Sequence, residues 1–334
     1  MIVITGGGTG GHLSIARSFK KELNKRNIVP FFIGSRNGQD RLWFEKDSGF
    51  GKKLFLSSSQ VVNKNIFLKI LTLIKLVFLS LKVAFFLKKE KVKKVISVGG
   101  YSAAPACFAA ILLKIDLFIH EQNSVTGELN KHLRSYAKRV FYSFGEQRVD
   151  YPVAERFFEN SRERGGEIKT IIFLGGSQGA SAINDLAIDL IDFLRIRKIR
   201  VIHQTGKKDF FKVKDAYKEK GFFADVFSFT DDLSLKLKQA DFAIARSGAG
   251  TLFELCANGL PACFVPYPYA AKNHQFSNAK FLAEKNLCFI QEEASLNRAQ
   301  IEQLLSSDHS EISKALLQNF QKSGTEKIID ICLG

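Results

Sequence analysis

The chain has 334 residues, of which 46% are hydrophobic and 25% charged, a composition that excludes a disordered or fibrous protein and allows two domains. Lys and Arg total 49 against 33 Asp and Glu, a formal net charge of +16. Such an excess favours an anionic partner: a phosphorylated substrate, an acidic membrane surface or nucleic acid. No nucleic-acid recognition motif accompanies the charge, so nucleic acid is not an expected partner.

The cysteines show no paired spacing, and their neighbours in the sequence are apolar. We predict that all of them are reduced and structural, which favours a cytosolic compartment. The N-terminus enters a short strand directly and lacks the basic and small-residue features of a signal peptide. The five residues concerned are Cys107, Cys256, Cys263, Cys288 and Cys332.

One pattern occurs twice: a β-rich run, a glycine turn and an apolar helical stretch. It is seen in IVITGGGTGG (2–11) and in IIFLGGSQGA (171–180), which is followed by a helical pattern over Ile183–Leu194. The repeat predicts an α/β protein of two Rossmann-like domains, with parallel sheets facing a central cleft and ligands at the carboxyl ends of the strands. Other predicted strands are 29–33, 95–98 and 117–119 in the first half and 201–203, 242–245 and 262–265 in the second.

The predicted changeover between the halves lies at 144–153. We therefore expect a first domain over 1–148 and a second over 149–315. A C-terminal helix at about 316–334 is expected to complete the first domain.

The glycine-rich opening contains Gly6, Gly8 and Gly11 in the spacing of a dinucleotide fingerprint. A nicotinamide site also requires an acidic residue after the second strand, where this chain has Gly34-Ser35-Arg36, and no phosphate-loop lysine follows the glycines. The motif therefore favours an anion site at a helix N-terminus. His12 closes the loop and is either structural or a general base.

Polar residues follow the predicted strand 117–119 in the run His120-Glu121-Gln122-Asn123. We expect few of them in the core; the alternative is a helix-capping turn that uses Asn123 or Ser124. A second glycine turn, Gly99 to Ser102, follows the strand 95–98 and is expected at the same sheet edge.

In the second half, small residues over 245–251 would let the backbone approach a diphosphate closely. Glu254 lies one helical turn after Thr251, where its carboxylate could accept hydrogen bonds from ribose hydroxyls; the alternative is an ordinary acid in a first helical turn. Other polar turns are 175–179, 203–206 and 273–275.

Residues 66–87 form the most hydrophobic segment, long enough to span a bilayer as a helix. A single span would place the preceding and following strands of the first sheet on opposite sides of the membrane, so we exclude it. On a helical wheel Lys69, Thr72, Lys75, Ser80 and Lys82 share one arc, and the opposite arc is apolar. With the lysines up to Lys94, this pattern predicts docking of 66–94 on an anionic membrane surface; the alternative is a core helix.

Taken together, these segments resemble the MurG family, the UDP-GlcNAc transferases of peptidoglycan synthesis. The matching motifs occur in the same order and cover nearly the whole chain: TGGGTGGH (5–12), SVGGYSAAP (97–105), HEQNSVTGELN (120–130), GGSQGA (175–180), HQTG (203–206), ARSGAGTLFEL (245–255) and GLPACFVPYPYAAKNHQFSNA (259–279).

The resemblance implies a GT-B fold and an inverting transfer with no cofactor and no required metal. The expected donor is UDP-GlcNAc. The expected acceptor is the 4-hydroxyl of the muramyl sugar of undecaprenyl-diphosphate-MurNAc-pentapeptide. The expected location is the cytoplasmic face of the inner membrane.

By motif position, the resemblance also assigns residue roles. His12 would be the catalytic base and Asn123 a supporting polar group. The acceptor diphosphate would be bound near Thr9, Gly10, Gly11, Gly100 and Tyr101. UDP-GlcNAc would be bound by Ser177, Gln178, Thr230, Arg246, Ala249, Gly250, Thr251, Glu254 and Gln275.

Two departures from the family pattern matter. After the histidine, Leu13 to Ala16 replace a proline-containing run, and Tyr151-Pro152-Val153-Ala154 replaces Asn-Pro-Val-Arg. The nucleotide-binding role of that arginine is vacant or shifted to Arg156. The alternatives are another UDP-sugar-dependent lipid glycosyltransferase, a nicotinamide oxidoreductase, or a non-catalytic membrane-docking subunit of a transferase.

Overall fold

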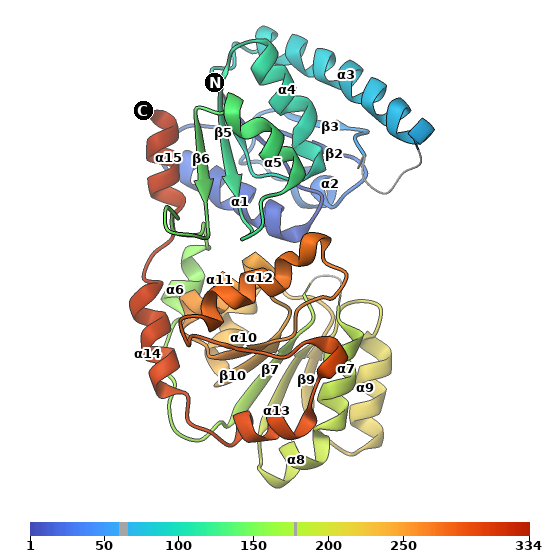
Figure 1. The fold of residues 1–334 in the computed structure, drawn as a ribbon, viewed down its shortest axis with the longest axis vertical. Helices are drawn as coiled ribbons and strands as arrows, with labels where there is room; N and C mark the ends of the chain where they lie inside the picture. Colours follow the sequence, from blue (N-terminus) through green and yellow to red (C-terminus); the bar gives the residue numbers. More distant parts are fainter. Residues whose placement is uncertain (60–65, 177–178) are drawn as a thin grey trace. The chain divides into compact units, whose positions relative to one another are not determined.

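The structure is a computed structural model that describes residues 1–59, 66–176 and 179–334 (Figure 1). The chain divides into two compact units, one formed by Met1–Pro152 with Ser323–Gly334 and the other by Val153–Lys322. The chain passes from the first unit to the second inside the segment 144–153. It returns to the first unit beyond residue 315, because helix α14 (Ser310–Asn319) packs against α11 (Ala249–Asn258) of the second unit.

The first unit contains a six-stranded sheet in the order β3-β2-β1-β4-β5-β6, and each neighbouring pair is parallel. All the strands therefore end at one edge, where the glycine turn after β1 and the polar run after β5 both emerge. The strands are β1 (Ile2–Thr5), β2 (Phe31–Ser35), β3 (Lys53–Leu56), β4 (Lys94–Ser97), β5 (Asp116–Glu121) and β6 (Arg139–Tyr142).

Strand residues of the first sheet alternate between two buried layers. Val3, Ile33 and Val95 share a core cluster with residues of α3 and α4, whereas Ile4 and Phe32 are buried outside that cluster. This alternation is the period-2 pattern of a sheet covered on both faces. The helices are α1 (Gly10–Lys25), α2 (Asp40–Phe44), α3 (Ile66–Lys89), α4 (Ala104–Leu112), α5 (Glu128–Leu133) and α15 (Thr325–Leu333), with short 3-10 turns at Tyr101–Ala103 and Arg134–Tyr136.

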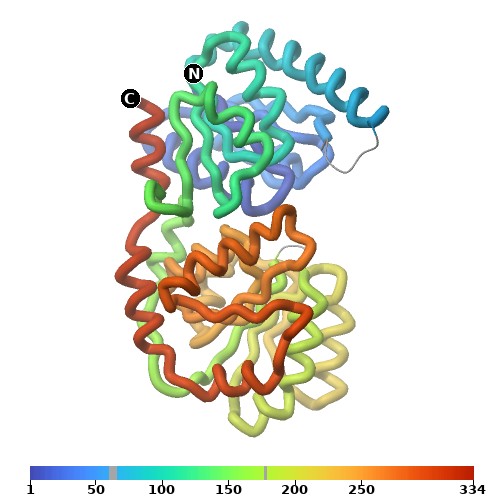
Figure 2. Tube along the Cα trace, viewed as in Figure 1, coloured from blue at the N-terminus to red at the C-terminus, as the bar shows by residue number. Residues whose placement is uncertain are grey.

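The C-terminal helix α15 belongs to the first unit, and both chain termini lie in that unit (Figure 2). It packs against α1, where Arg26 and Asp330 form an ion pair at 2.5 Å. The Lys94 ammonium donates to the Leu333 carbonyl oxygen at 2.5 Å. These contacts fix the last helix to the first sheet.

The second unit repeats this architecture with a parallel sheet in the order β12-β11-β10-β7-β8-β9. Its strands are β7 (Thr170–Leu174), β8 (Arg200–Gln204), β9 (Ala224–Phe227), β10 (Phe242–Ala245), β11 (Ala262–Phe264) and β12 (Phe289–Ile290). Its helices are α6 (Glu155–Glu159), α7 (Ser181–Asp189), α8 (Ile191–Ile196), α9 (Phe210–Glu219), α10 (Leu233–Gln239), α11, α12 (His274–Ala283), α13 (Arg298–Leu305) and α14, with 3-10 turns at Ala271–Asn273 and Glu293–Ser295. The two six-stranded parallel sheets confirm the predicted fold class.

Helix α3 exposes the surface that a core helix would bury. It packs against α4 through its small residues and its C-terminal end, and most of its large apolar side chains are exposed. Thr72 and Ser80 face inward because their hydroxyls donate to the carbonyl oxygens of Leu68 and Leu76, at 2.6 and 2.8 Å. The arc shared by these residues and the lysines is therefore divided: Thr72 and Ser80 are buried, whereas Lys75 and Lys82 are exposed. The exposed apolar face of α3 consists of Ile66, Phe67, Leu68, Ile70, Leu71, Leu73, Ile74, Val77, Phe78, Leu81 and Phe85.

Among the described residues, α3 is the one helix long and apolar enough to cross a membrane. The strands that precede and follow it, β3 and β4, belong to one sheet. A crossing would separate them, so α3 stays on one side, as the sequence predicts.

Arg164 holds three segments of the second unit together. It is 3% exposed, and burial lowers its pKa to about 9, with a further contribution from the charge of Arg162. Its guanidinium donates to the carbonyl oxygens of Arg162 (2.6 Å), Leu237 (3.0 Å), Ala240 (3.2 Å) and Asn258, and to the Asn258 side-chain oxygen at 2.5 Å. The guanidinium thus links the end of α10 to the end of α11.

We expect Arg164→Met to lower the free energy of unfolding by about 3 kcal/mol, because several buried carbonyl groups would lose their donors. Urea unfolding followed by circular dichroism measures this change. The matched control is Lys212→Met, which removes an exposed ion pair to Asp185 and is expected to leave the urea midpoint unchanged within error. Equal effects of the two substitutions would contradict the assignment.

Candidate functional site

Two glycine turns meet at the carboxyl edge of the first sheet. The Gly7 amide donates to the Gly99 carbonyl oxygen at 3.1 Å. A Cβ atom on Gly6 would collide with that same oxygen, and one on Gly100 with the carbonyl oxygen of Gly7. Gly6, Gly99 and Gly100 also have positive φ, so only glycine fits this contact without strain.

A buried carboxylate binds the backbone of the first glycine turn. Asp40 is fully buried, and its two oxygens accept hydrogen bonds from the Gly8 amide (2.5 Å) and the Ser35 amide (2.7 Å). No acid follows the second strand directly, and Asp40, five positions beyond Ser35, is not among the site residues predicted from the sequence. This carboxylate holds the loop by accepting from backbone amides that precede α1. The amides at the N-terminus of α1, which begins at Gly10, are not used by Asp40.

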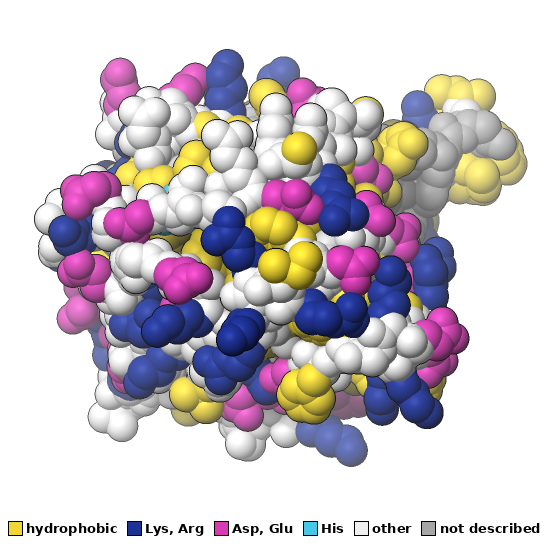
Figure 3. Space-filling view, turned by 90° about the horizontal axis from the view of Figure 1, so that it is seen from below, with side chains coloured by type: hydrophobic (Ala, Val, Ile, Leu, Met, Phe, Trp, Pro, Cys, Tyr) yellow, Lys and Arg dark blue, Asp and Glu magenta, His cyan; other side chains and the backbone are white. Residues whose placement is uncertain are grey.

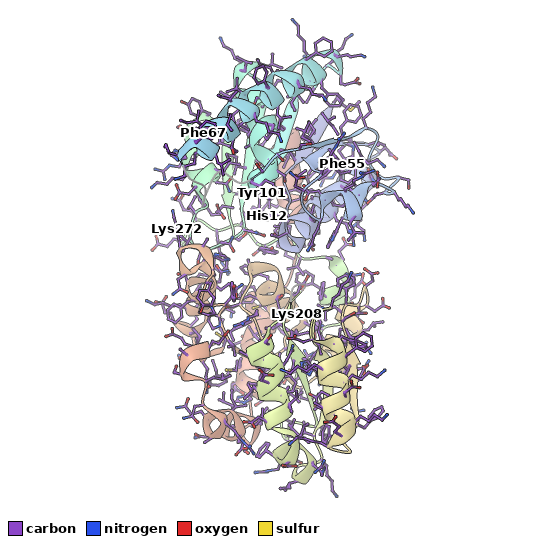
Figure 4. The ribbon with its side chains drawn as sticks, turned by 90° about the vertical axis from the view of Figure 1, so that its right-hand side faces the viewer. His12, Phe55, Phe67, Tyr101, Lys208 and Lys272 are labelled. Carbon is purple, nitrogen blue, oxygen red and sulfur yellow. The ribbon has the colours of Figure 1, made fainter. Side chains whose placement is uncertain are left out.

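His12 lies in the first turn of α1, with polar groups near both ring nitrogens. Thr9 Oγ1 is 2.9 Å from Nδ1, and Gln122 Nε2 is 2.9 Å from Nε2. The side chains of His12 and Tyr101 lie at the same edge of the first unit (Figure 4), where the Tyr101 ring packs on Gly8. The structure therefore brings together Thr9, Gly10, Gly11, His12, Gly100 and Tyr101, as the sequence predicts.

The polar run after β5 is more deeply buried than expected. Strand β5 continues through Glu121, and His120 and Glu121 are 0% and 3% exposed. Burial, together with a smaller contribution from the nearby His12, lowers the pKa of His120 to about 3, so the ring is neutral and belongs to the core. The expectation that these residues lie outside the core is therefore wrong.

Glu121 organises the loop that follows. Its carboxylate accepts from the amides of Asn123 (3.1 Å) and Gly127 (2.9 Å) and from the Asn130 side chain (2.8 Å). This ring of donors fixes the backbone at Asn123, the predicted supporting group. The sequence assigns no role to Glu121 or Gln122, although both lie in the polar run and in the motif that carries the resemblance.

The second unit presents a helix N-terminus at the carboxyl edge of its own sheet. Helix α11 begins at Ala249, directly after β10, so the amides of Ala249, Gly250 and Thr251 occupy its first turn. Ser247 is fully buried just before it, and its hydroxyl has no hydrogen-bond partner within the described chain. This end of α11 is suited to an anion, because its first amides and the helix dipole both point there.

Glu254 lies one turn further along α11. Burial raises the pKa of its carboxyl group to about 7, while the charge of Arg156 on α6 acts in the opposite direction. A carboxyl group poised near neutrality beside a helix N-terminus is typical of a functional position. The electrostatic pairing also places Arg156, the candidate for the missing family arginine, near Glu254.

The other residues predicted to bind UDP-GlcNAc already make contacts within the second unit. The Arg246 guanidinium donates to the carbonyl oxygens of Val265 and Pro266, both at 3.0 Å, and pairs with Glu293 at 2.5 Å. It therefore holds the loop after β11, and its role in donor binding stays a prediction. The Gln275 side-chain oxygen accepts from the Tyr267 amide at 3.0 Å, and Thr230 Oγ1 accepts from the Asp232 amide at 3.1 Å. Ser177 and Gln178 lie outside the described residues.

His203 lies near the end of β8, as the sequence predicts, but its side chain belongs to the core. It lies within β8 and is fully buried, and its nitrogens contact Tyr217 Oη and Asn184 Oδ1, both at 3.0 Å. Burial lowers the pKa of His203 to about 3. Both nitrogens are satisfied within the protein, so its role is structural.

Comparison with known proteins agrees with this architecture. Residues 2–142 match the glycosyltransferase family 28 N-terminal domain, and residues 170–331 match the corresponding C-terminal domain. A transferase of Campylobacter jejuni subsp. doylei is 49% identical over 99% of this chain and 97% of its own length. One of Wolinella succinogenes is 42% identical over 99% of both chains. Both are named UDP-N-acetylglucosamine--N-acetylmuramyl-(pentapeptide) pyrophosphoryl-undecaprenol N-acetylglucosamine transferase.

Among solved structures, MurG of Acinetobacter baumannii superposes with a TM-score of 0.78 at 25% identity and covers 99% of both chains. The Streptomyces glycosyltransferase SsfS6, solved with thymidine diphosphate, shares the fold with a TM-score of 0.66 at 13% identity. The two matched domains make the chain a glycosyltransferase of family 28. Within that class it belongs to the MurG family.

Proposed function

We propose that the protein transfers GlcNAc from UDP-GlcNAc to the 4-hydroxyl of the muramyl sugar of undecaprenyl-diphosphate-MurNAc-pentapeptide, the step that converts lipid I to lipid II in peptidoglycan synthesis. The full-length relationship to transferases of this name carries the proposal. The two anion-suited sheet edges support it, because both substrates contain a diphosphate. In this proposal the first unit binds the acceptor and the second binds the donor.

On the donor side, the amides of Ala249, Gly250 and Thr251 bind the diphosphate of UDP-GlcNAc, and the α11 dipole stabilises its charge. The Glu254 carboxylate accepts hydrogen bonds from the ribose hydroxyls. Arg156 lies close enough to influence Glu254 and provides the cation that the family places at position 154. We assign the remaining recognition of the base and sugar to Thr230 and Gln275.

The transfer then needs one proton acceptor and one stabilised leaving group. His12 takes the proton of the attacking 4-hydroxyl, and the oxygen forms a bond to the anomeric carbon of GlcNAc. The bond between that carbon and the UDP oxygen breaks, and UDP leaves with the electron pair. Backbone amides at the start of α11 stabilise the charge that develops on the leaving diphosphate.

We further propose that the protein works at the cytoplasmic face of the inner membrane, held there by the first unit. Residues 1–152 and 323–334 contain 26 Lys and Arg against 12 Asp and Glu, a net charge of +14, whereas residues 153–322 contain 23 against 21, a net charge of +2. The unit with this positive charge also has the exposed apolar face of α3. Figure 3 shows basic and acidic side chains interspersed on one face of the second unit and hydrophobic side chains gathered where α3 begins. An apolar face with lysines around it is suited to anionic lipid headgroups.

Purified protein is expected to form lipid II from UDP-GlcNAc and the lipid acceptor, and His12→Ala is expected to lower kcat about a thousandfold, because the proton acceptor is lost. Product formation is measured by chromatography. The affinity of His12→Ala for UDP-GlcNAc is measured by calorimetry and is expected to lie within about twofold of that of the unaltered protein. His132→Ala, which alters an exposed histidine of the same unit, is the matched control. Full activity of His12→Ala would remove this residue as the base.

Binding of UDP is expected to weaken as the pH falls below about 7. The raised pKa of Glu254 means that its carboxyl group is protonated there and loses acceptor capacity for the ribose hydroxyls. We expect Kd to rise about tenfold between pH 8 and pH 6. Glu254→Gln cannot ionise and is the control for the titration of UDP itself. The same pH dependence in both proteins would contradict this role of Glu254.

Liposome sedimentation tests the membrane proposal. The protein is expected to bind phosphatidylglycerol vesicles in a salt-sensitive manner, and the triple substitution of Ile70, Phe78 and Phe85 by Ser is expected to weaken binding at least about tenfold. Phe211→Ser alters an aromatic residue of the second unit that is 73% exposed and is expected to bind like the unaltered protein. Equal binding to neutral phosphatidylcholine vesicles, or no binding to either, would contradict the proposal.

A further inference from the structure

The two ring nitrogens of His12 are held by different chemical groups. Nδ1 faces the hydroxyl of Thr9, which can donate or accept, and Nε2 faces the amide nitrogen of Gln122, which can only donate. Gln122 follows β5 directly and is buried. Gly11 leaves room for its amide, because a Cβ atom at that position would lie 3.3 Å from Gln122 Oε1.

Tyr151 contacts the oxygen end of the Gln122 amide. The Tyr151 hydroxyl donates to Gln122 Oε1 at 3.4 Å, so the amide nitrogen is the end that faces His12. Tyr151 is itself buried; its ring packs edge-on against His120, with centroids 5.9 Å apart, and its carbonyl oxygen accepts from the Gly324 amide at 3.2 Å. A line of hydrogen bonds thus runs from Tyr151 through Gln122 to His12.

We propose that Gln122, anchored by Tyr151, is a positioning residue that fixes the tautomer of His12. A donor at Nε2 requires the lone pair on Nε2 and therefore the proton on Nδ1, which donates to Thr9 Oγ1. Nε2 is then the nitrogen that takes the proton of the acceptor hydroxyl. This inference rests on the proposed role of His12 as the base.

The amide of Gln122 occupies the place that the attacking hydroxyl needs. When the acceptor binds, its 4-hydroxyl replaces the amide as the donor to Nε2, so one hydrogen bond is exchanged for another and the lone pair stays in hydrogen-bonded contact throughout. Thr9 keeps its bond to Nδ1 during this exchange. After proton transfer both nitrogens carry protons, and Thr9 remains the acceptor for Nδ1–H.

Nitrogen-15 NMR of the full-length protein, labelled at histidine, tests the tautomer without relying on turnover. His12→Ala identifies the His12 signals by their loss. We expect the unaltered protein to show Nδ1 protonated and Nε2 unprotonated as the major form at pH 8. Nε2 protonated as the major form would overturn the proposal whatever the activity.

Two substitutions in the line of hydrogen bonds complete the test. Gln122→Leu is expected to give a mixture of the two tautomers and to lower kcat about tenfold with an unchanged Kd for UDP. Tyr151→Phe keeps the ring against His120 and removes only the hydroxyl, and we expect it to shift the tautomer in the same direction with a loss of about threefold in kcat. If both variants fold and retain the original tautomer, Gln122 does not set it and the proposal fails. A fully active His12→Ala would instead overturn the base role, and the NMR result distinguishes the two failures.

Discussion

The close contact between the two glycine turns of the first unit is the constraint on which the proposed acceptor site depends. Strands β1 and β4 are neighbours in one parallel sheet, so the turns that follow them leave the sheet side by side at the same edge. Their backbones approach so closely that the Gly7 amide bonds to the Gly99 carbonyl oxygen. Side chains at Gly6 or Gly100 would force the turns apart, and with them the start of α1 and His12.

The sequence predicts the parts of the fold that depend on local pattern. The central strands are continuous apolar runs, and the glycine turns that follow them indicate the carboxyl edges of both sheets. The edge strands β3, β6, β9 and β12 were not predicted, because they are short and largely half-buried and so have no strong periodicity. The predicted helix Ile183–Leu194 is two helices that meet at Leu190.

Side chains that act across long distances in the chain could not be assigned from pattern alone. A polar run after a strand indicates a site, but the structure shows that His120 and His203 are core residues. Both are fully buried, and the side chains that bond to them come from other elements of the fold. The role of Asp40 could not be predicted from the sequence either, because its partners are the backbone amides of Gly8 and Ser35, which come close to it only in the folded chain. The burial of Thr72 and Ser80 in α3 has a local cause: each hydroxyl can bond to a carbonyl oxygen of its own helix.

The division of charge gives the two units different electrostatic surroundings. The first unit has most of the excess positive charge, whereas the second is almost balanced and relies on a helix terminus and backbone amides. Salt therefore acts differently on the two: long-range attraction between the first unit and an anionic surface is screened, while short contacts at the start of α11 are affected less.

The exposed apolar face of α3 also has a consequence for the protein in water. Apolar surface of this extent is unfavourable in solution and is reduced by any contact that covers it. A second copy of the chain offers the same surface, so under the proposed membrane docking we expect self-association to compete with lipid for it. If α3 docks as proposed, the solubility of the isolated protein is expected to depend on the availability of bilayer or detergent, although each unit has its own buried core.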